Sequence, residues 1–233
     1  MPEPQSVEWR CMIPIGDDQV LRRPSTVVWT LVFLNVAIYL WDRGGSLFGP
    51  PTLFSDLGCR PNELIDALRG TEKAPLATLF TAQFLHANLW HLVGNMLYLV
   101  VFGRTIEQAI GPWRFGLYYF AWGFVALVAQ VLVAPFSSVP IVGASGAISG
   151  VLGMYLLLFP TNRIRVVVYF WELEFQAFVL LGLFFLKDVL FPSQGVANWA
   201  HVGGFLAGML SVLVMGGRDR VLARYFYESR IAA

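Results

Sequence analysis

The chain has 233 residues, of which 57% are hydrophobic and only 13% are charged. This balance lies outside the usual range of soluble domains and predicts a membrane protein. The net charge of +1 and the scattered arginines argue against a nucleic-acid partner. No long polar block is present, so we expect a single helical domain and no second globular unit.

Six apolar segments have lengths typical of, or close to, helices that span a bilayer. They cover residues 26–41, 89–103, 115–134, 145–159, 175–191 and 197–215. The predicted fold class is therefore an all-α polytopic membrane protein with a bundle of six transmembrane helices. Residues 42–88 are rich in Gly, Pro and charge, which predicts a long structured first outer loop. Residues 164–171 are apolar but too short to span, and we expect a loop along the surface there.

The distribution of Lys and Arg predicts the orientation of the bundle, because basic residues favour cytoplasmic loops. Most basic residues fall on the cytoplasmic side when the amino terminus is placed there. Residues 1–25 are then a cytoplasmic N-terminal segment, residues 26–217 the six-helix domain, and residues 218–233 a cytoplasmic tail. The first segment lacks an apolar core, so we expect no cleavable signal peptide.

A serine and a histidine lie inside apolar stretches, where polar residues are costly and often functional. Ser145 and His201 both lie near the outer membrane face in the predicted topology. The helix that begins at Ser145 would be about 22 Å long, shorter than a hydrocarbon core of about 30 Å. It therefore starts below the membrane surface, and residues 139–144 are expected to dip into a water-holding cavity.

Small residues indicate how these two polar groups could meet. The segments that begin near Ser145 and His201 each have a helix face made of small residues, and such faces let membrane helices approach closely. Close approach would bring the imidazole of His201 to the hydroxyl of Ser145, as base and nucleophile. The expected packing positions are Gly143, Gly146, Gly150, Gly204 and Gly208. The alternative is that Ser145 caps a helix, His201 is a hydrogen-bonded structural residue, and the glycines are ordinary packing.

Two more polar residues fall at the same depth in the second apolar segment. His91 and Asn95 are four residues apart and so share a helix face. Both could donate hydrogen bonds into the cavity, where acyl transfer needs donors aimed at the developing oxyanion. Hydrogen bonding between helices is the alternative. His86 lies outside the apolar segment and is more typical of a loop anchor than of a catalyst.

Three ordered motifs carry a resemblance to a known family. The patterns HxxxN at residues 91–95, GxSG at 143–146 and AHxxGxxxG at 200–208 resemble those of rhomboid intramembrane serine proteases. The similarity extends to residues 102–107 and to residues 12–18, which resemble the opening of many bacterial rhomboids. It covers nearly the whole chain.

The resemblance implies a Ser-His dyad without a carboxylate third member. Ser145 is then the nucleophile, and His201 acts as general base and later as general acid. His91, Asn95 and the backbone N–H of Ser145 would form the oxyanion hole. Independently of the family, no Asp or Glu lies in the segments that carry Ser145 and His201, so a buried carboxylate partner is not expected. Neither a metal nor a cofactor is expected.

Two departures from the family pattern concern the surroundings of this dyad. Some rhomboids have an aromatic residue one turn after the nucleophile, stacked on the histidine, where this chain has Ser149. The first outer loop also lacks the Trp-Arg pair of some relatives. We therefore expect differences in substrate access and loop packing, with the same chemistry.

The expected function is that of a serine endopeptidase that cuts peptide bonds in or near transmembrane helices. Its partners would be the lipid bilayer and membrane-protein substrates, in a cell membrane of bacterial inner-membrane type with both termini cytoplasmic. The oligomeric state does not follow from the sequence. The alternative function is a catalytically silent rhomboid-like protein that binds transmembrane segments. A small transporter would require charged or broken-helix ion sites near the midplane, and the sequence shows none.

Overall fold

The computed structural model describes residues 12–21, 23–52, 54–70, 76–193 and 195–231, so residues 1–11 and 22 of the predicted segment 1–25 lie outside the described residues. The helices are α1 (Thr26–Asp42), α2 (Phe54–Leu57), α3 (Pro61–Leu68), α4 (Thr78–Thr81), η2 (Ala82–Phe84), α5 (Leu89–Tyr98), η3 (Leu99–Gly103), α6 (Arg104–Ile110), α7 (Pro112–Val133), α8 (Ser145–Leu158), α9 (Ala177–Leu190), α10 (Asn198–Val214) and α11 (Arg218–Ile231). The strands are β1 (Met12–Asp17), β2 (Arg163–Val168) and β3 (Trp171–Gln176).

Each of the six apolar segments contains a long helix in the structure: α1, α5 with η3, α7, α8, α9 and α10. Among the described residues, two helices are long and apolar enough to cross a membrane, Leu89–Ile110 and Pro112–Val133. The helices Thr26–Asp42, Ser145–Leu158 and Asn198–Val214 are apolar but shorter. Helices therefore form where the sequence predicts them, while their number as membrane spans stays a prediction.

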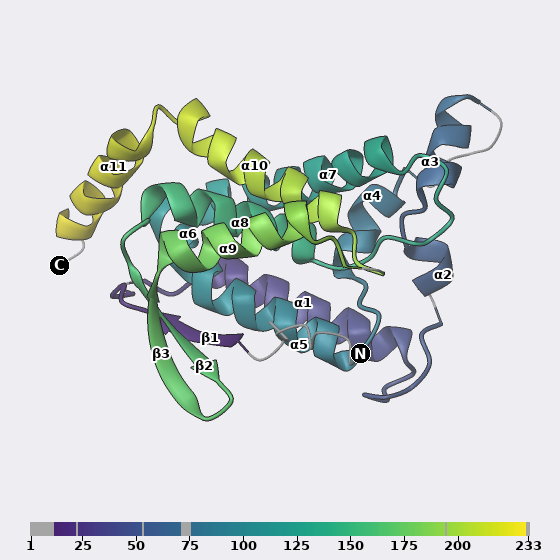
Figure 1. The fold of residues 1–233 in the computed structure, drawn as a ribbon, viewed down its shortest axis with the longest axis horizontal. Coiled ribbons are helices and arrows are strands. Elements are labelled where there is room, and N and C mark those ends of the chain that lie inside the picture. Colours follow the sequence, from purple (N-terminus) through teal and green to yellow (C-terminus); the bar gives the residue numbers. More distant parts are fainter. Residues whose placement is uncertain (1–11, 22, 53, 71–75, 194, 232–233) are drawn as a thin grey trace, which may run out of the picture.

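Helix α8 lies in the middle of the bundle (Figure 1). It packs against α7, α9 and α10. Nearly all of its side chains after Ser145 are buried, and none carries a charge. Because other helices surround α8, it does not need the length of a helix that faces lipid along its whole course.

Helices α8 and α10 touch backbone to backbone. A Cβ atom at Gly204 would collide with the carbonyl oxygen of Gly146, and one at Gly208 with the carbonyl oxygen of Gly150. These glycines belong to the two small-residue faces noted in the sequence. Only residues without a side chain allow this approach, so the glycines set the spacing between the two helices.

A three-stranded antiparallel sheet departs from the all-α prediction. Its strand order is β1-β2-β3. Residues 164–171, predicted as a surface loop, form most of β2 and the turn into β3. The prediction was wrong because the segment was judged as a membrane span, by its short length and by the glutamates that follow it. Its β-branched residues and the burial of Ile164 and Val166 on alternate positions are typical of a strand.

The first strand is tied to the central helix through Asp17. The carboxylate of Asp17 accepts hydrogen bonds from the hydroxyls of Tyr155 on α8, at 2.8 Å, and Thr105 on α6, at 2.7 Å. Burial raises the pKa of the Asp17 carboxyl, although both hydrogen bonds act in the opposite direction. Residues from three distant parts of the chain are thus joined at the end of α8 opposite to Ser145.

Glu107 fixes the start of α1. Its buried carboxylate accepts hydrogen bonds from the backbone N–H groups of Val27, at 3.0 Å, and Val28, at 2.8 Å. Unpaired N–H groups at a helix start are stabilised by such an acceptor, and the negative charge also suits the helix dipole. The segment 102–107 therefore has a structural role.

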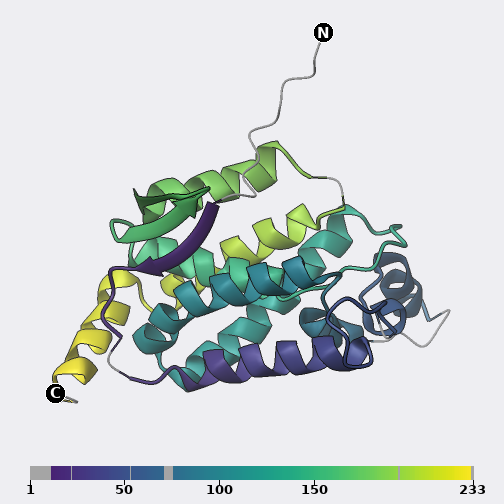
Figure 2. The same ribbon diagram turned by 90° about the horizontal axis from the view of Figure 1, so that it is seen from below.

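The two ends of the molecule differ. The sheet and α11 lie at one end, whereas α2, α3 and α4 lie at the other (Figures 1 and 2). At the second end the guanidinium of Arg43 pairs with Asp42 at 3.0 Å and lies 3.9 Å from the ring centre of Tyr39. It also donates to the carbonyl oxygens of His86 and Ala87 at 2.8 and 2.9 Å. One buried cation therefore organises the segment between α1 and α5.

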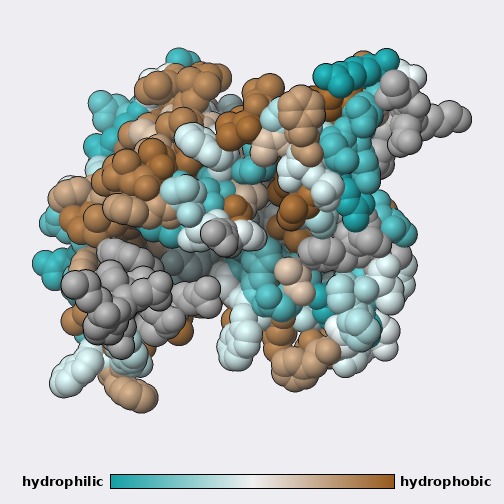
Figure 3. All heavy atoms as spheres, turned by 45° about the vertical axis from the view of Figure 1, so that its right-hand side comes forward, coloured by the Kyte–Doolittle hydropathy of each residue, from teal (hydrophilic) through white to brown (hydrophobic). Residues whose placement is uncertain are grey.

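Large apolar side chains are exposed on the outer sides of the helices. Phe33 is 70% exposed, Leu117 59% and Leu213 63%. Figure 3 shows apolar side chains gathered over much of the left-hand half of one face. Soluble monomers rarely expose large apolar patches, so this surface suits contact with lipid.

The glycine contact between α8 and α10 leads to a test of stability. We expect Gly208→Ala to destabilise the protein by about 2 kcal/mol, because the new methyl group forces two backbones apart. Gly182→Ala is the matched control, since a Cβ there meets no atom of the described residues within 4 Å. Equal unfolding temperatures in detergent for the two variants would contradict the role of the contact.

Candidate active site

Ser145 is the first residue of α8, and the loop before it is held in place by backbone hydrogen bonds. Ile141 and Cys59 exchange N–H···O bonds of 2.8 and 3.1 Å, and the N–H of Gly143 donates to the carbonyl of Ala82 at 2.8 Å. Gly143 has a φ of +117°, which strongly favours glycine. The loop therefore delivers Ser145 to a defined position.

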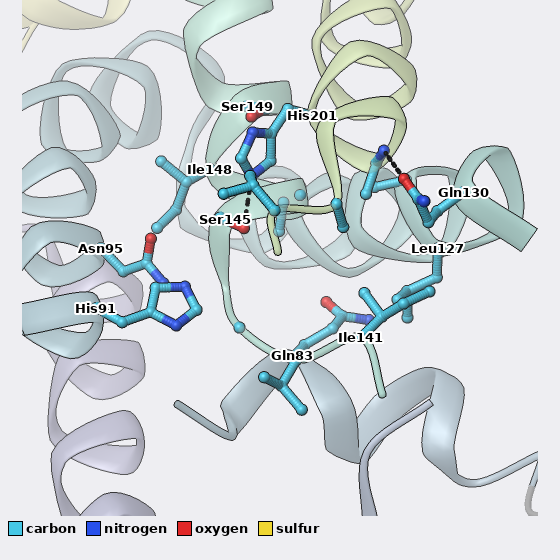
Figure 4. Close-up of a pocket in the computed structure, with 18 of the residues that line it drawn as sticks. Gln83, His91, Asn95, Leu127, Gln130, Ile141, Ser145, Ile148, Ser149 and His201 are labelled. Carbon is cyan, nitrogen blue, oxygen red and sulfur yellow. Dashed lines mark hydrogen bonds between the residues drawn. The ribbon is translucent and has the colours of Figure 1, made fainter. Parts of the chain in front are cut away.

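His201 reaches Ser145 from α10. Its Nε2 atom lies 2.9 Å from the Oγ atom of Ser145 (Figure 4). The start of α10 is fixed by Gln130 on α7, whose side-chain oxygen accepts from the N–H groups of Trp199 and Ala200 at 3.1 and 3.2 Å. The two polar residues that the sequence singles out are thus brought together by three helices.

The other ring nitrogen of His201 has a carboxylate partner, which corrects the expectation of a histidine without one. Its Nδ1 atom lies 2.9 Å from the Oδ2 atom of Asp188 on α9. The sequence argument considered only the helices that carry Ser145 and His201. Asp188 precedes His201 by 13 residues. An acidic residue close to the end of an apolar helix, at the same predicted membrane face as the histidine, was the available signal.

An aromatic ring also supports His201. Phe184, one turn before Asp188 on α9, stacks on the imidazole with 6.3 Å between ring centres and 29° between planes. Ser149 occupies the position on α8 where some rhomboids have the stacking residue, and it is buried close to Gly204. The stacking partner therefore comes from a different helix in this chain.

His91 and Asn95 point into the same cavity from α5 (Figure 4). The side chain of Asn88 caps this helix by accepting from the N–H of His91 at 2.9 Å. Asn95 is 8% exposed, and its Nδ2 atom has no hydrogen-bond partner among the described residues. An unpaired buried donor costs about 1–3 kcal/mol, so this amide is available to an acceptor in the cavity.

His86 lies behind the cavity and is fully buried. Its Nδ1–H donates to the carbonyl of Phe84 at 3.1 Å, and its ring lies edge-on to His91. Burial, with the neighbouring His91 adding to it, lowers the pKa of His86 to about 3. His86 is therefore neutral at physiological pH and holds the loop before α5.

Ser145, His201, His91 and Asn95 line one cavity of about 900 Å³. Within the described part of the chain, no group of three or more His, Cys, Asp or Glu side chains is placed to hold a metal ion. A hydroxyl bonded to an imidazole, with a carboxylate behind it and the Asn95 amide across the cavity, is an arrangement that serine hydrolases use.

Comparison with known proteins narrows this class. Residues 73–218, which include the cavity residues Ser145, His201, His91 and Asn95, match the family described as Rhomboid domain. The chain is 34% identical over 171 residues to RHOMBOID-like protein 1 of Arabidopsis thaliana, a match that covers 70% of this chain and 40% of that protein. The chain belongs to the rhomboid family.

Two bacterial relatives carry the word protease in their names. The chain is 30% identical over 191 residues to Rhomboid protease GluP of Bacillus subtilis (strain 168), covering 81% of this chain and 35% of GluP. It is also 30% identical over 145 residues to Putative rhomboid protease YdcA of the same organism, covering 61% of this chain and 69% of YdcA. The chain thus spans well under half the length of RHOMBOID-like protein 1 and GluP.

The anchor at the start of α10 can be tested by itself. We expect Gln130→Ala to lower the free energy of unfolding by about 1 kcal/mol, because the first N–H groups of α10 lose their acceptor. Gln130→Glu keeps an acceptor oxygen, so its free energy of unfolding should fall by less. Denaturant titrations in detergent measure both variants, and equal losses would show that the acceptor is not the stabilising feature.

Proposed function

We propose that this chain is an intramembrane serine endopeptidase that hydrolyses peptide bonds in or near transmembrane helices of membrane-protein substrates. The observation that carries the proposal is the 2.9 Å contact between the Ser145 hydroxyl and His201 Nε2, with the unpartnered Asn95 amide across the same cavity. Membership of the rhomboid family, in which relatives are named proteases, supports it.

The reaction proceeds by acyl transfer. Ser145 Oγ attacks the carbonyl carbon of the scissile bond while its proton passes to His201 Nε2. When the C–N bond breaks, His201 returns this proton to the leaving amine, and an acyl-Ser145 ester remains. Water then attacks the ester with His201 again as base, which releases the carboxyl product and restores the serine hydroxyl.

The oxyanion that forms in each half-reaction needs fixed donors. The Nδ2 group of Asn95, the ring of His91 and the backbone N–H of Ser145 fill this role in our proposal. As the first residue of α8, Ser145 has no partner for its N–H within the helix. The small backbone of Gly143, next to the ring of His91, leaves room for the substrate oxygen.

The membrane setting is part of the proposal. Six helices, α1, the continuous α5–α6 helix, α7, α8, α9 and α10, cross the bilayer, with both termini in the cytoplasm. The exposed apolar side chains and the excess of arginine on one side support this arrangement. The cavity then opens toward the outer side, where water is available for hydrolysis. A bacterial inner membrane fits this orientation, and the bilayer and single-span substrates are the proposed partners.

The nucleophile can be tested with a fluorophosphonate probe on detergent-solubilised protein. We expect the wild type to be labelled and Ser145→Ala and His201→Ala to lose labelling, because the probe reacts only with an activated serine. Ser46→Ala, in an exposed loop, is the control and should label normally. Labelling that persists in Ser145→Ala would refute the nucleophile, whereas an unlabelled, inactive wild type would favour the silent binding protein.

The oxyanion role of Asn95 is tested by kinetics. Asn95→Ala should reduce kcat by about 10²-fold with a smaller effect on KM, because the donor acts mainly in the transition state. Asn35→Ala removes another buried amide, one that donates to the carbonyl of Leu31 within α1, and serves as the control. Cleavage of a single-span substrate measures both variants, and an unchanged kcat for folded Asn95→Ala would exclude this role.

A further inference from the structure

We propose that Asp188 is a positioning residue for His201, a role that rests on the proposed proteolytic function. Its carboxylate fixes the imidazole in the tautomer that carries a proton on Nδ1, so that the lone pair of Nε2 faces the hydroxyl of Ser145. The site is then a Ser-His-Asp triad assembled from α8, α10 and α9.

The distances define the direction of each hydrogen bond. An ionised carboxylate can only accept, so the 2.9 Å contact between His201 Nδ1 and Asp188 Oδ2 places the proton on Nδ1. In a neutral imidazole the Nε2 atom is then an acceptor. Its contact of 2.9 Å with Ser145 Oγ is therefore donated by the serine, as a general base requires.

The carboxylate of Asp188 is held from both sides. Its side chain is only 2% exposed, and a buried charge persists only with partners. His201 binds Oδ2, and the ammonium group of Lys187 lies 3.0 Å from Oδ1. Lys187 is itself partly exposed. Because both oxygens are engaged, the carboxylate has a defined orientation toward the imidazole.

The same face of α9 also fixes the plane of the ring. Phe184 and Asp188 are four residues apart, so both project toward α10 from neighbouring turns. Phe184 stacks on the imidazole while Asp188 binds its edge. One helix thereby restricts the tilt of the ring and selects its tautomer.

The carboxylate also acts during the reaction. When His201 takes the proton of Ser145, a positive imidazolium forms next to Asp188. The negative charge stabilises this ion while its own protonation state stays unchanged, so no proton moves to Asp188. The alternative is that the pair only joins α9 to α10, in which case its loss would reduce stability without changing the tautomer.

Asp188→Asn is the decisive variant, made in the full chain and assayed in detergent. An amide can present its NH₂ group to Nδ1, which favours the tautomer that cannot accept from Ser145. We expect kcat to fall by about 10²- to 10⁴-fold and KM to change by less than about threefold. The rate of fluorophosphonate labelling should fall in parallel. Asp188→Glu keeps a carboxylate, so its kcat should be at least about tenfold higher than that of Asp188→Asn.

Glu172→Gln provides a matched exchange of carboxylate for amide. Glu172 lies on β3 in an exposed ion pair with Arg165, at the other end of the molecule. The kcat and the labelling rate of Glu172→Gln should equal those of the wild type. Thermal unfolding of all variants separates loss of fold from loss of positioning. If Asp188→Asn does not fold, the comparison is made with Asp188→Ser, which also removes the carboxylate.

Nitrogen NMR gives a readout that does not depend on activity. The chain has three histidines, so ¹⁵N-histidine labelling gives an assignable spectrum. We expect His201 to carry its proton on Nδ1 in the wild type and to shift toward the Nε2–H form in Asp188→Asn. The inference would be overturned if the wild type reacts with the fluorophosphonate and cleaves substrate while Asp188→Asn keeps the same kcat and the same tautomer of His201. That result would leave the proposed function intact. A wild type that neither labels nor cleaves overturns the proposed function, and the spectra then decide the positioning of His201 by themselves.

Discussion

The candidate site depends on the backbone contact between α8 and α10. Gly146 directly follows Ser145, and Gly204 lies one turn after His201, so the point of closest approach is next to these two side chains. The 2.9 Å distance between them exists because neither helix has a side chain at the contact. A displacement of about 1 Å at a catalytic centre can cost on the order of 100-fold in rate. The glycines therefore determine the geometry of the candidate site as well as the packing of the two helices.

The central helix is fixed at both ends. Its start follows a loop bound to Ala82 and Cys59, while near its end Tyr155 binds Asp17 and the carbonyl of Leu158 accepts from Arg218 at 3.0 Å. These contacts lie outside the cavity and belong to segments that the chemistry does not use. They limit sliding of α8 along its axis, which would separate Ser145 from His201. The sheet at the far end of the molecule is in this sense part of what positions the site.

The sequence predicted the long helices and singled out Ser145 and His201 because polar residues in apolar runs are conspicuous. It offered Asp188 as an acidic residue at the same predicted membrane face as His201, but it could not establish their contact. That contact depends on how α9 is rotated about its axis, and residue spacing along separate helices does not encode this angle. Phe184 was hidden for the same reason, as one of many apolar residues in an apolar helix. The hairpin was missed because residues 164–171 were compared with the length of a membrane span, although the β-branched residues of this segment favoured a strand.

The position and the orientation of His201 come from different helices. Its position follows from the close packing of α10 on α8, and its orientation from Asp188 and Phe184 on α9. Ser149 on α8 is small, which leaves room beside Gly204 but provides no ring to stack on the imidazole. Among the residues of α9, only Ala177, Leu181 and Asp188 are buried, so this helix is less enclosed than α8. The orientation of His201 therefore rests on the less enclosed of its two supports. The buried carboxylate of Asp188, held by Lys187 and His201, compensates for this.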